Sequence, residues 1–402
     1  MLVFSALRPA TDNPLAIAPG LLSGRMCASS GRTAVACKNP VDCAISTANA
    51  GGMPGDALAR LGIAAVLLEG STPSGISQDI WQNLIIDEGG ARLAPSRVNG
   101  LNTYEAMSAL ARQYGPQYKE TCSFITIGKA GEACLPVSTI AFSDRGGQPA
   151  RHAGGGSGAV MGGKGLKAII IQETAAKPPI ADERAFAAAA KGFADALRAY
   201  GRGIGGHSSG KGCAPGCVLA CKDGSAGSVK EDGAIGKWPE YMSLWSPSTI
   251  PGAIPAATLG PADYANFDRY AYLCNDLGLD AFAAGEMLAL LNKQGVLERG
   301  KAETALALLE SASCNPKNLG NPLISGLFAH AACAAREGTE ESVILDSLGV
   351  CRFASKALAE NESVRAALSD MLTARFGPGL SFEDVGASAR SVLRAERAFA
   401  DL

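Results

Sequence analysis

Residues 166–201, LKAIIIQETAAKPPIADERAFAAAAKGFADALRAYG, contain the change in pattern that decides the fold. The apolar, β-branched run at 166–171 follows a glycine and is typical of a buried strand. Lys177-Pro178-Pro179 interrupts regular structure and is interpreted as a linker. Asp182 is a suitable N-cap for the alanine-rich run that ends near Gly201, so the sequence predicts a long helix there.

The rest of the chain keeps the same division. Two further apolar runs that adjoin glycine, Gly62–Leu68 and Ser123–Ile127, predict strands before the linker. After the linker the pattern predicts helices, one opening at Pro261 and the others at 285–292, 301–311 and 363–376. Strands followed by helices favour an α+β fold over an alternating, doubly wound sheet.

The composition is that of a soluble globular chain. Its 402 residues suffice for two or three domains at roughly 100 to 200 residues each. The net charge is −2 and there is no basic block, so a nucleic-acid partner is not expected. The longest apolar stretches are shorter than the ~18 residues of a membrane-spanning helix, and the apolar start is too short for a secretory signal. We therefore expect a cytoplasmic protein with no membrane partner.

The strongest local signal is Gly212-Cys213-Ala214-Pro215-Gly216-Cys217-Val218-Leu219-Ala220-Cys221, in which three cysteines are spaced four apart. Pro215 and Gly216 would break a helix, so the segment predicts a loop leading into a helical turn. Such a loop allows three thiolates to converge. The chain has 12 cysteines, too few for a disulfide scaffold of this length, so thiols or metal ligands are expected in a reducing compartment.

Three converging thiolates indicate an iron–sulfur cluster, which is usually held by four cysteines and so needs a remote fourth. Cys351 is the best candidate. Zinc is an alternative metal, although histidine could not easily complete its shell because only His207 is nearby. A second alternative is that the thiols fill a packed loop. The remaining cysteines have no clustered spacing and are assigned to packing: Cys27, Cys37, Cys43, Cys122, Cys134, Cys274, Cys314 and Cys333.

A second signal is the glycine-rich stretch Gly154–Gly165, immediately before the strand at 166–171. Glycines allow backbone N–H groups to approach an anion, so a phosphate-bearing ligand is one interpretation and a close-packed turn is the other. Gly158 to Lys164 matches G-x-x-x-x-G-K. Gly165 stands where a P-loop needs Ser or Thr, however, and a strand follows where a P-loop has a helix. A nucleotide hydrolase is therefore disfavoured.

Two short segments are alike: Asn275-Asp276-Leu277-Gly278-Leu279-Asp280 and Asp346-Ser347-Leu348-Gly349-Val350-Cys351. Each ends a helical run with glycine, which predicts a C-cap. Their similarity suggests that two helix ends face one ligand from opposite sides. A carboxylate in such a position could accept hydrogen bonds from amide or amino groups of the ligand.

These motifs, in this order, resemble the tungsten-containing aldehyde:ferredoxin oxidoreductase family. Before the linker the resemblance is carried by Gly20-Leu21-Leu22-Ser23-Gly24, Ser30-Gly31-Arg32, Lys38-Asn39-Pro40, Asn49-Ala50-Gly51-Gly52, Ile127-Gly128-Lys129-Ala130-Gly131-Glu132 and Gly158-Ala159-Val160-Met161-Gly162. After the linker it is carried by the cysteine loop, Trp238-Pro239-Glu240-Tyr241 and the paired segments. It runs from about residue 14 to the C-terminus.

The resemblance implies three parts. Residues 1–174 would form a β-sandwich-like base domain that supports a tungsten or molybdenum bispterin. Residues 175–338 would form a helical domain with the cysteine loop, and residues 339–402 a helical C-terminal remnant. The function implied is oxidation of an aldehyde with water to a carboxylic acid, with electrons passed through a [4Fe–4S] cluster to ferredoxin or another iron–sulfur carrier. A homodimer is among the assemblies to be tested.

The resemblance also assigns site residues. The cluster ligands would be Cys213, Cys217, Cys221 and Cys351. The residues near the pterin or its phosphates would be Arg32, Asn49, Gly51, Gly155 and Gly156, and the pterin amino groups would be bonded by Asp280 and Asp346. Glu240 is the one candidate catalytic residue near the substrate, and a solvated or capping carboxylate is the alternative for it.

The chain also departs from the family pattern. Only 65 residues separate Asp280 from Asp346, so the family's longer stretch of substrate and pterin motifs is missing, as are its opening strands. Gly154 stands where many members have arginine. We therefore expect a shortened member whose pterin and substrate sites are reduced more than its cluster site. The alternatives are a non-catalytic iron–sulfur subunit for electron transfer or assembly, and an incomplete gene product.

Overall fold

The structure is a computed structural model, and it describes residues 13–25, 27–41, 43–72, 80–119, 121–147, 149–203, 216–218, 264–298, 301–314, 339–351 and 354–400. Within these ranges every strand lies before residue 173, and every helix of 13 or more residues lies after it. The predicted α+β order, strands first and helices afterwards, is confirmed. The segment between the last strand and the first long helix, residues 173–182, contains neither helix nor strand, as expected for a linker.

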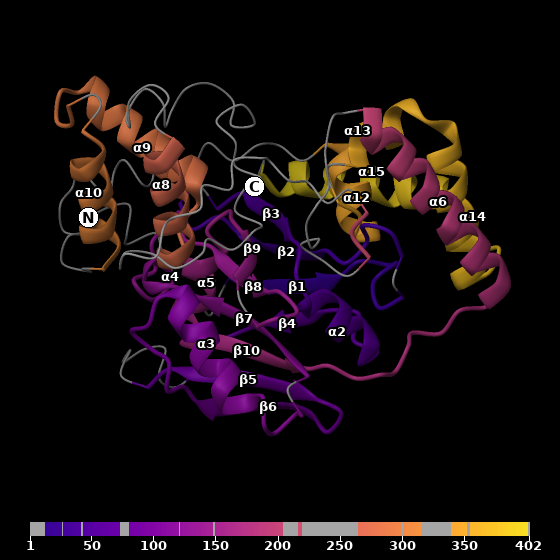
Figure 1. The fold of residues 1–402 in the computed structure, drawn as a ribbon, viewed down its shortest axis with the longest axis horizontal. Helices are drawn as coiled ribbons and strands as arrows, with labels where there is room; N and C mark the ends of the chain where they lie inside the picture. Colours follow the sequence, from indigo (N-terminus) through magenta and orange to yellow (C-terminus); the bar gives the residue numbers. More distant parts are fainter. Residues whose placement is uncertain are drawn as a thin grey trace.

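Two sheets form the base (Figure 1). The first is antiparallel, with the strand order β3-β2-β1-β4, and consists of β1 (Leu15–Pro19), β2 (Thr33–Lys38), β3 (Ile45–Ala50) and β4 (Val66–Leu68). The second has the order β6-β5-β10-β7-β8-β9 and consists of β5 (Gln82–Asp87), β6 (Gly90–Pro95), β7 (Cys122–Ile127), β8 (Ile140–Ser143), β9 (Pro149–Ala153) and β10 (Leu166–Gln172). In the second sheet β10 pairs in parallel with β5 and antiparallel with β7.

The two sheets share one hydrophobic core. Ile17 of the first sheet and Ile125, Phe142 and Ile169 of the second are buried in it together. The other face of the second sheet is covered by α3 (Thr103–Tyr114), which forms a separate buried cluster with the sheet. Because side chains alternate between the two faces of a strand and both faces are covered, the central strands β7 and β10 are buried along almost their whole length. This packing is the β-sandwich-like base that was expected.

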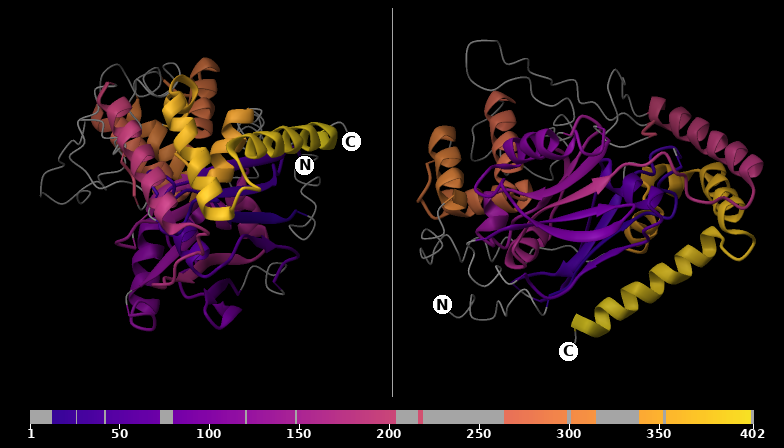
Figure 2. Two further views of the ribbon diagram at one scale, coloured as in Figure 1. Left: turned by 90° about the vertical axis from the view of Figure 1, so that its right-hand side faces the viewer. Right: turned by 90° about the horizontal axis from the view of Figure 1, so that it is seen from below.

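Two groups of helices lie on the base, one on each side (Figure 1). One group consists of α8 (Tyr264–Leu277), α9 (Ala281–Lys293) and α10 (Ala302–Cys314). The other consists of α6 (Glu183–Gly203), α12 (Glu340–Leu348), α13 (Ser355–Glu360), α14 (Glu362–Phe376) and α15 (Phe382–Ala400). Each group has its own hydrophobic core. Figure 2 shows α15 extending from the second group along the outside of the molecule. No helix in the described ranges is long and apolar enough to cross a membrane.

Two segments differ from the expectation. Of the predicted strand Gly62–Leu68 only Val66–Leu68 is a strand, because Gly62 takes a left-handed conformation (φ 76°) in the turn that follows α2 (Pro54–Arg60). Part of the glycine-rich stretch is a short helix, α5 (Ser157–Gly163), rather than a loop. A side chain at Gly158 would lie 2.6 Å from the carbonyl oxygen of Thr139, so the glycines let this helix pack closely on its neighbours.

Candidate functional site

The two similar segments end their helices in the same way. Gly278 after α8 and Gly349 after α12 both have positive φ, 76° and 71°. In each, the glycine N–H donates to the carbonyl three residues earlier and the next N–H donates to the carbonyl five residues earlier, over 2.7 to 3.2 Å. This is the Schellman arrangement, in which glycine avoids the steric cost of the left-handed conformation. The predicted C-caps are therefore confirmed.

Both helix ends also dock on the base in the same way. The carbonyl of Gly349 accepts a hydrogen bond from the N–H of Arg32 (3.1 Å), and that of Gly278 accepts one from the N–H of Thr139 (2.8 Å). At each contact a glycine of the base, Gly20 or Gly128, approaches so closely that a Cβ on it would overlap the helix-end backbone. The repeated segments thus fix α8 and α12 to the base on its two sides (Figure 1).

Three of the predicted cofactor residues form one chain of hydrogen bonds. The guanidinium of Arg32 donates through Nη2 to the backbone carbonyl of Asn49 (2.8 Å) and through Nε to its Oδ1. The side-chain amide of Asn49, on β3, donates in turn to Oδ1 of Asp346 near the end of α12. All three side chains are half-buried, and the predicted Gly51 follows β3 directly. A cation, an amide and a carboxylate therefore meet where α12 docks.

Asp280 lies against the glycine-rich turn. Its N–H donates to the carbonyl of Val137 (2.8 Å), and its Oδ1 caps α9 by accepting from a backbone N–H (3.3 Å). Its other carboxylate oxygen lies so close to Gly154 that a side chain at that position would overlap it. The predicted residues Gly155 and Gly156 follow with φ of 70° and 78°. This turn comes after β9, which contacts β3, so both aspartate sites border the edge where the two sheets meet.

Two of the four predicted cluster ligands are described, and one residue connects them. Cys351 is 6% exposed and Cys217 is half-buried. The backbone N–H of Ser29 donates to the carbonyl of Gly216 (3.0 Å), and the backbone carbonyl of Ser29 accepts from the N–H of Cys351 (2.9 Å). The structure therefore brings the segments that carry Cys217 and Cys351 to the same loop. Cys213, Cys221 and Glu240 lie outside the described residues.

The other described cysteines fit the packing assignment with one exception. Burial raises the pKa of the Cys27, Cys37, Cys122 and Cys274 thiols to about 12 and that of Cys134 to about 11, so these groups remain protonated near neutral pH. The assignment is wrong for Cys43, which is exposed. It lies in the turn between β2 and β3, where its φ is positive (61°). The side chain of Cys314 and all of Cys333 lie outside the described residues.

The donor set fits the cofactors that the resemblance implies. Thiolates are the usual ligands of iron–sulfur clusters, and the two described cysteines that would supply them lie on adjoining segments. Asp280 and Asp346 offer acceptors for amino groups, and Arg32 offers a cation for an anionic ligand. Within the described ranges no three metal-binding side chains come together. Two of the four predicted ligands, Cys213 and Cys221, lie outside those ranges.

Ser29, which joins the segments of Cys217 and Cys351, was not singled out by sequence reasoning. It stands in Ala28-Ser29-Ser30, and neither its left-handed φ of 55° nor its contacts with residues almost 200 and more than 300 positions away leave a sequence signal. Its place before Ser30-Gly31-Arg32, a motif of the resemblance, was the nearest hint.

Residues 4–173 match the family described as aldehyde ferredoxin oxidoreductase, N-terminal domain. A tungsten-containing aldehyde ferredoxin oxidoreductase from Pyrococcus furiosus is 27% identical over an alignment of 352 residues, and the alignment covers 77% of this chain and 52% of the relative. The corresponding protein from Thermococcus kodakarensis is 28% identical over an alignment of 320 residues, which covers 69% of this chain and 49% of the relative. The one from Pyrococcus abyssi is 33% identical over 162 residues, 40% of this chain and 24% of the relative.

Among solved structures, the active site complex BamBC of benzoyl coenzyme A reductase, in complex with 1,5-dienoyl-CoA, has the same fold. The TM-score is 0.65 at 15% identity, over 100% of this chain and 84% of that one. The likeness to this structure concerns the fold. Residues 4–173 match the aldehyde ferredoxin oxidoreductase N-terminal domain family, and the chain is related to the tungsten-containing enzymes. It spans about half the length of the first two of these relatives.

Proposed function

We propose that the chain is an oxidoreductase that oxidises a small aldehyde to a carboxylic acid and delivers the electrons to ferredoxin or another iron–sulfur carrier. When bound, a tungsten or molybdenum bispterin would supply the two-electron chemistry, RCHO + H₂O → RCOOH + 2H⁺ + 2e⁻, and a [4Fe–4S] cluster would carry electrons singly. The kinship with tungsten-containing aldehyde ferredoxin oxidoreductases supports this proposal.

The observation that carries the proposal is the position of the loop Ser29–Arg32. Its first residue bonds to the segments of Cys217 and Cys351, and its last residue bonds to Asn49. Three residues of extended chain span at most about 11 Å, so the cysteine segments lie close to the cluster of polar side chains around Asp346. A redox centre held by the cysteines would therefore adjoin a ligand held by the polar groups.

Each residue has a defined task in this proposal. The thiolates of Cys213, Cys217, Cys221 and Cys351 hold the iron. Asp280 and Asp346 accept hydrogen bonds from the amino groups of the pterin and orient it from two sides. The guanidinium of Arg32 offsets the negative charge of the bound group. Glu240 is proposed as the carboxylate nearest the substrate.

The test is the metal content of anaerobically purified protein, with a visible spectrum and an aldehyde-dependent dye-reduction assay on the same sample. We expect about four iron atoms per chain, tungsten or molybdenum, and activity. Cys351→Ser should lose the iron, and Cys37→Ser, in which a buried packing thiol is changed, should keep it. If the protein contained iron but no tungsten or molybdenum and had no activity, the result would favour a non-catalytic iron–sulfur subunit over an enzyme. A wild-type chain without iron would refute both.

A further inference from the structure

We propose that Ser29 is a positioning residue for the iron–sulfur cluster, which sets how Cys217 and Cys351 lie relative to each other. This inference rests on the cluster proposed above. Ser29 is not a ligand, because a hydroxyl is a poor match for iron–sulfur clusters, which are held by cysteine thiolates. It acts through the two segments that carry the ligands.

The contacts of Ser29 clamp the backbone on both sides of Cys217. Its N–H donates to the carbonyl of Gly216 (3.0 Å), and its hydroxyl oxygen accepts from the N–H of Val218 (3.3 Å). The peptide groups before and after the ligand are therefore both fixed by one residue. The carbonyl of Ser29 accepts from the N–H of Cys351 (2.9 Å). The N–H, the hydroxyl and the carbonyl of Ser29 therefore each bond to a segment that carries a predicted cluster ligand.

The conformation of Ser29 is needed for this arrangement. Its φ of 55° lies in the left-handed region, which is uncommon and unfavourable for residues other than glycine. It is also only 2% exposed, so water cannot replace the contacts of its hydroxyl. Glycine would adopt this backbone without cost but would leave the Val218 N–H without its acceptor. The hydroxyl thus gives serine a role that glycine could not fill.

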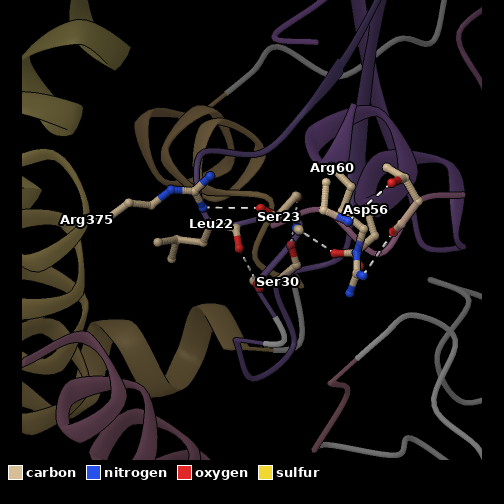
Figure 3. Close-up of polar contacts among 9 residues, drawn as sticks. Leu22, Ser23, Ser30, Asp56, Arg60 and Arg375 are labelled. Atoms are coloured by element: carbon tan, nitrogen blue, oxygen red, sulfur yellow. Dashed lines mark hydrogen bonds and ion pairs between the residues drawn. The ribbon is translucent and has the colours of Figure 1, made fainter. Parts of the chain in front are cut away.

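The loop that presents Ser29 is itself anchored to two other elements (Figure 3). On one side Gly24 donates its N–H to Oδ1 of Asp56 in α2 (2.6 Å), a carboxylate that Nε of Arg60 also holds (3.1 Å). On the other side Nη1 of Arg375 in α14 donates to the carbonyl of Ser23 (3.2 Å). The loop that carries Ser29 is therefore held in place by α2 and α14. Through Ser29, the segments of Cys217 and Cys351 are positioned relative to the base as well as relative to each other.

Ser30 provides a matched control. It is also 2% exposed, but its hydroxyl donates to the carbonyls of Cys27 (3.0 Å) and Leu22 (3.4 Å), both within the loop. Ser30→Ala therefore removes an equally buried hydroxyl that does not contact the segments carrying Cys217 and Cys351. Ser29→Ala and Ser29→Gly both remove the clamp, and Ser29→Gly does so without backbone strain, which covers the case in which Ser29→Ala folds poorly.

The experiment compares wild type and these three variants after anaerobic iron–sulfur reconstitution. The readouts are the rate of iron release to a chelator and the midpoint potential of the cluster. We expect both Ser29 variants to release iron roughly threefold to tenfold faster, as loss of one buried hydrogen bond implies. We also expect a more positive potential, because the freed Val218 N–H can turn towards the Cys217 sulfur, and hydrogen bonds to sulfur tune the potential. Ser30→Ala should match wild type in both.

Two outcomes would overturn the inference. One is that the Ser29 variants have wild-type release rates and potentials, which would show that the hydroxyl does not position the cluster although the cluster exists. The other is that Ser29→Ala and Ser30→Ala accelerate release equally with unchanged potentials, which would show a general loosening of the loop. A wild-type chain that takes up no iron would instead refute the proposed function, so the two failures are distinguishable.

Discussion

Lys167 shows how single residues hold charge inside the base. Its side chain is fully buried, and its ammonium donates to the carbonyls of Ile127 (2.7 Å) and Leu101 (2.9 Å) and pairs with Glu132 (2.6 Å). An ammonium has three donors, so all of them are satisfied. Burial lowers the pKa of Lys167, and the Glu132 carboxylate opposes this. The charged state of Lys167 therefore depends on the Glu132 carboxylate.

Glu132→Gln should destabilise the chain by about 3 kcal/mol or more, because it leaves a buried ammonium without its counter-charge. Glutamine keeps an oxygen that can accept from the Gly100 N–H, which the carboxylate accepts at 2.9 Å, so the change isolates the charge. Urea unfolding measures the free energy. The double variant Glu132→Gln with Lys167→Met should recover much of the loss. A cost below about 1 kcal/mol for Glu132→Gln alone would contradict this account.

Asp276 gives a prediction about pH. Burial raises the pKa of this carboxyl above its ordinary 3.8, although Asn102 Nδ2 (2.9 Å) and the Tyr104 N–H (3.3 Å) donate to it. The folded chain thus keeps the proton to a higher pH than the unfolded chain. The associated stability is fully present below pH 3.8 and is lost as the pH rises through the raised pKa.

Asp276→Asn cannot titrate, so its stability relative to wild type should increase with pH across that window and then stay constant. The increase should be about 1.4 kcal/mol for each pH unit that the window spans. Paired urea titrations between pH 3 and 8 would measure the difference, and a difference that does not change with pH would show that the pKa of Asp276 is not raised.

At the scale of elements, four helices, α2, α8, α9 and α12, end in the same Schellman arrangement, with different surroundings. The glycines at 278 and 349 are packed against the base, whereas Gly295 after α9 has φ 74° and a Cβ added to it would meet nothing within 4 Å. The same backbone geometry therefore occurs with and without a docking contact. This allows the cost of conformation to be separated from the cost of close approach.

Gly295→Ala should cost about 1 kcal/mol, the price of placing a Cβ in the left-handed region. Gly349→Ala should cost clearly more, because its Cβ would also lie 2.9 Å from Gly20 Cα and from the carbonyl oxygen of Ser30. Thermal unfolding of the two variants beside wild type checks the ranking. Equal losses of stability in the two variants would mean that the contact between α12 and the base can shift to accommodate the extra methyl group.

The elements and the site differ in how far the sequence predicts them. The run at 168–171 is apolar because both faces of the strand are buried, so its pattern predicts a strand directly. α5 was not predicted, because its glycines serve tight packing that only the folded neighbours reveal. The aspartates and cysteines were predicted from motifs. Ser29 was not, because its partners, such as Cys351, are distant in sequence.

At the scale of the whole molecule, the two helical groups reach the site separately. Asp346 and Cys351 come from the end of α12, whose core includes Leu22 and Cys27 of the base loop. Asp280 comes from the start of α9, whose core instead includes Ala130 of α4 (Lys129–Glu132). A cluster held by the cysteines would therefore touch one group, whereas a bispterin that bonds to both aspartates would connect the two.

Hydrogen exchange can distinguish these two degrees of loading. Iron alone should slow exchange at Ser29, Val218 and Cys351, because metal ligation restricts the opening of segments already joined by hydrogen bonds. It should leave the amides of α8 and Asp280 unchanged, since they belong to the other core. A chain that also holds the bispterin should show added protection at Asp280 and in the turn that contains Gly155. Protection of both groups by iron alone would mean that the two sides are coupled through the base, and the separate roles assigned to them would be wrong.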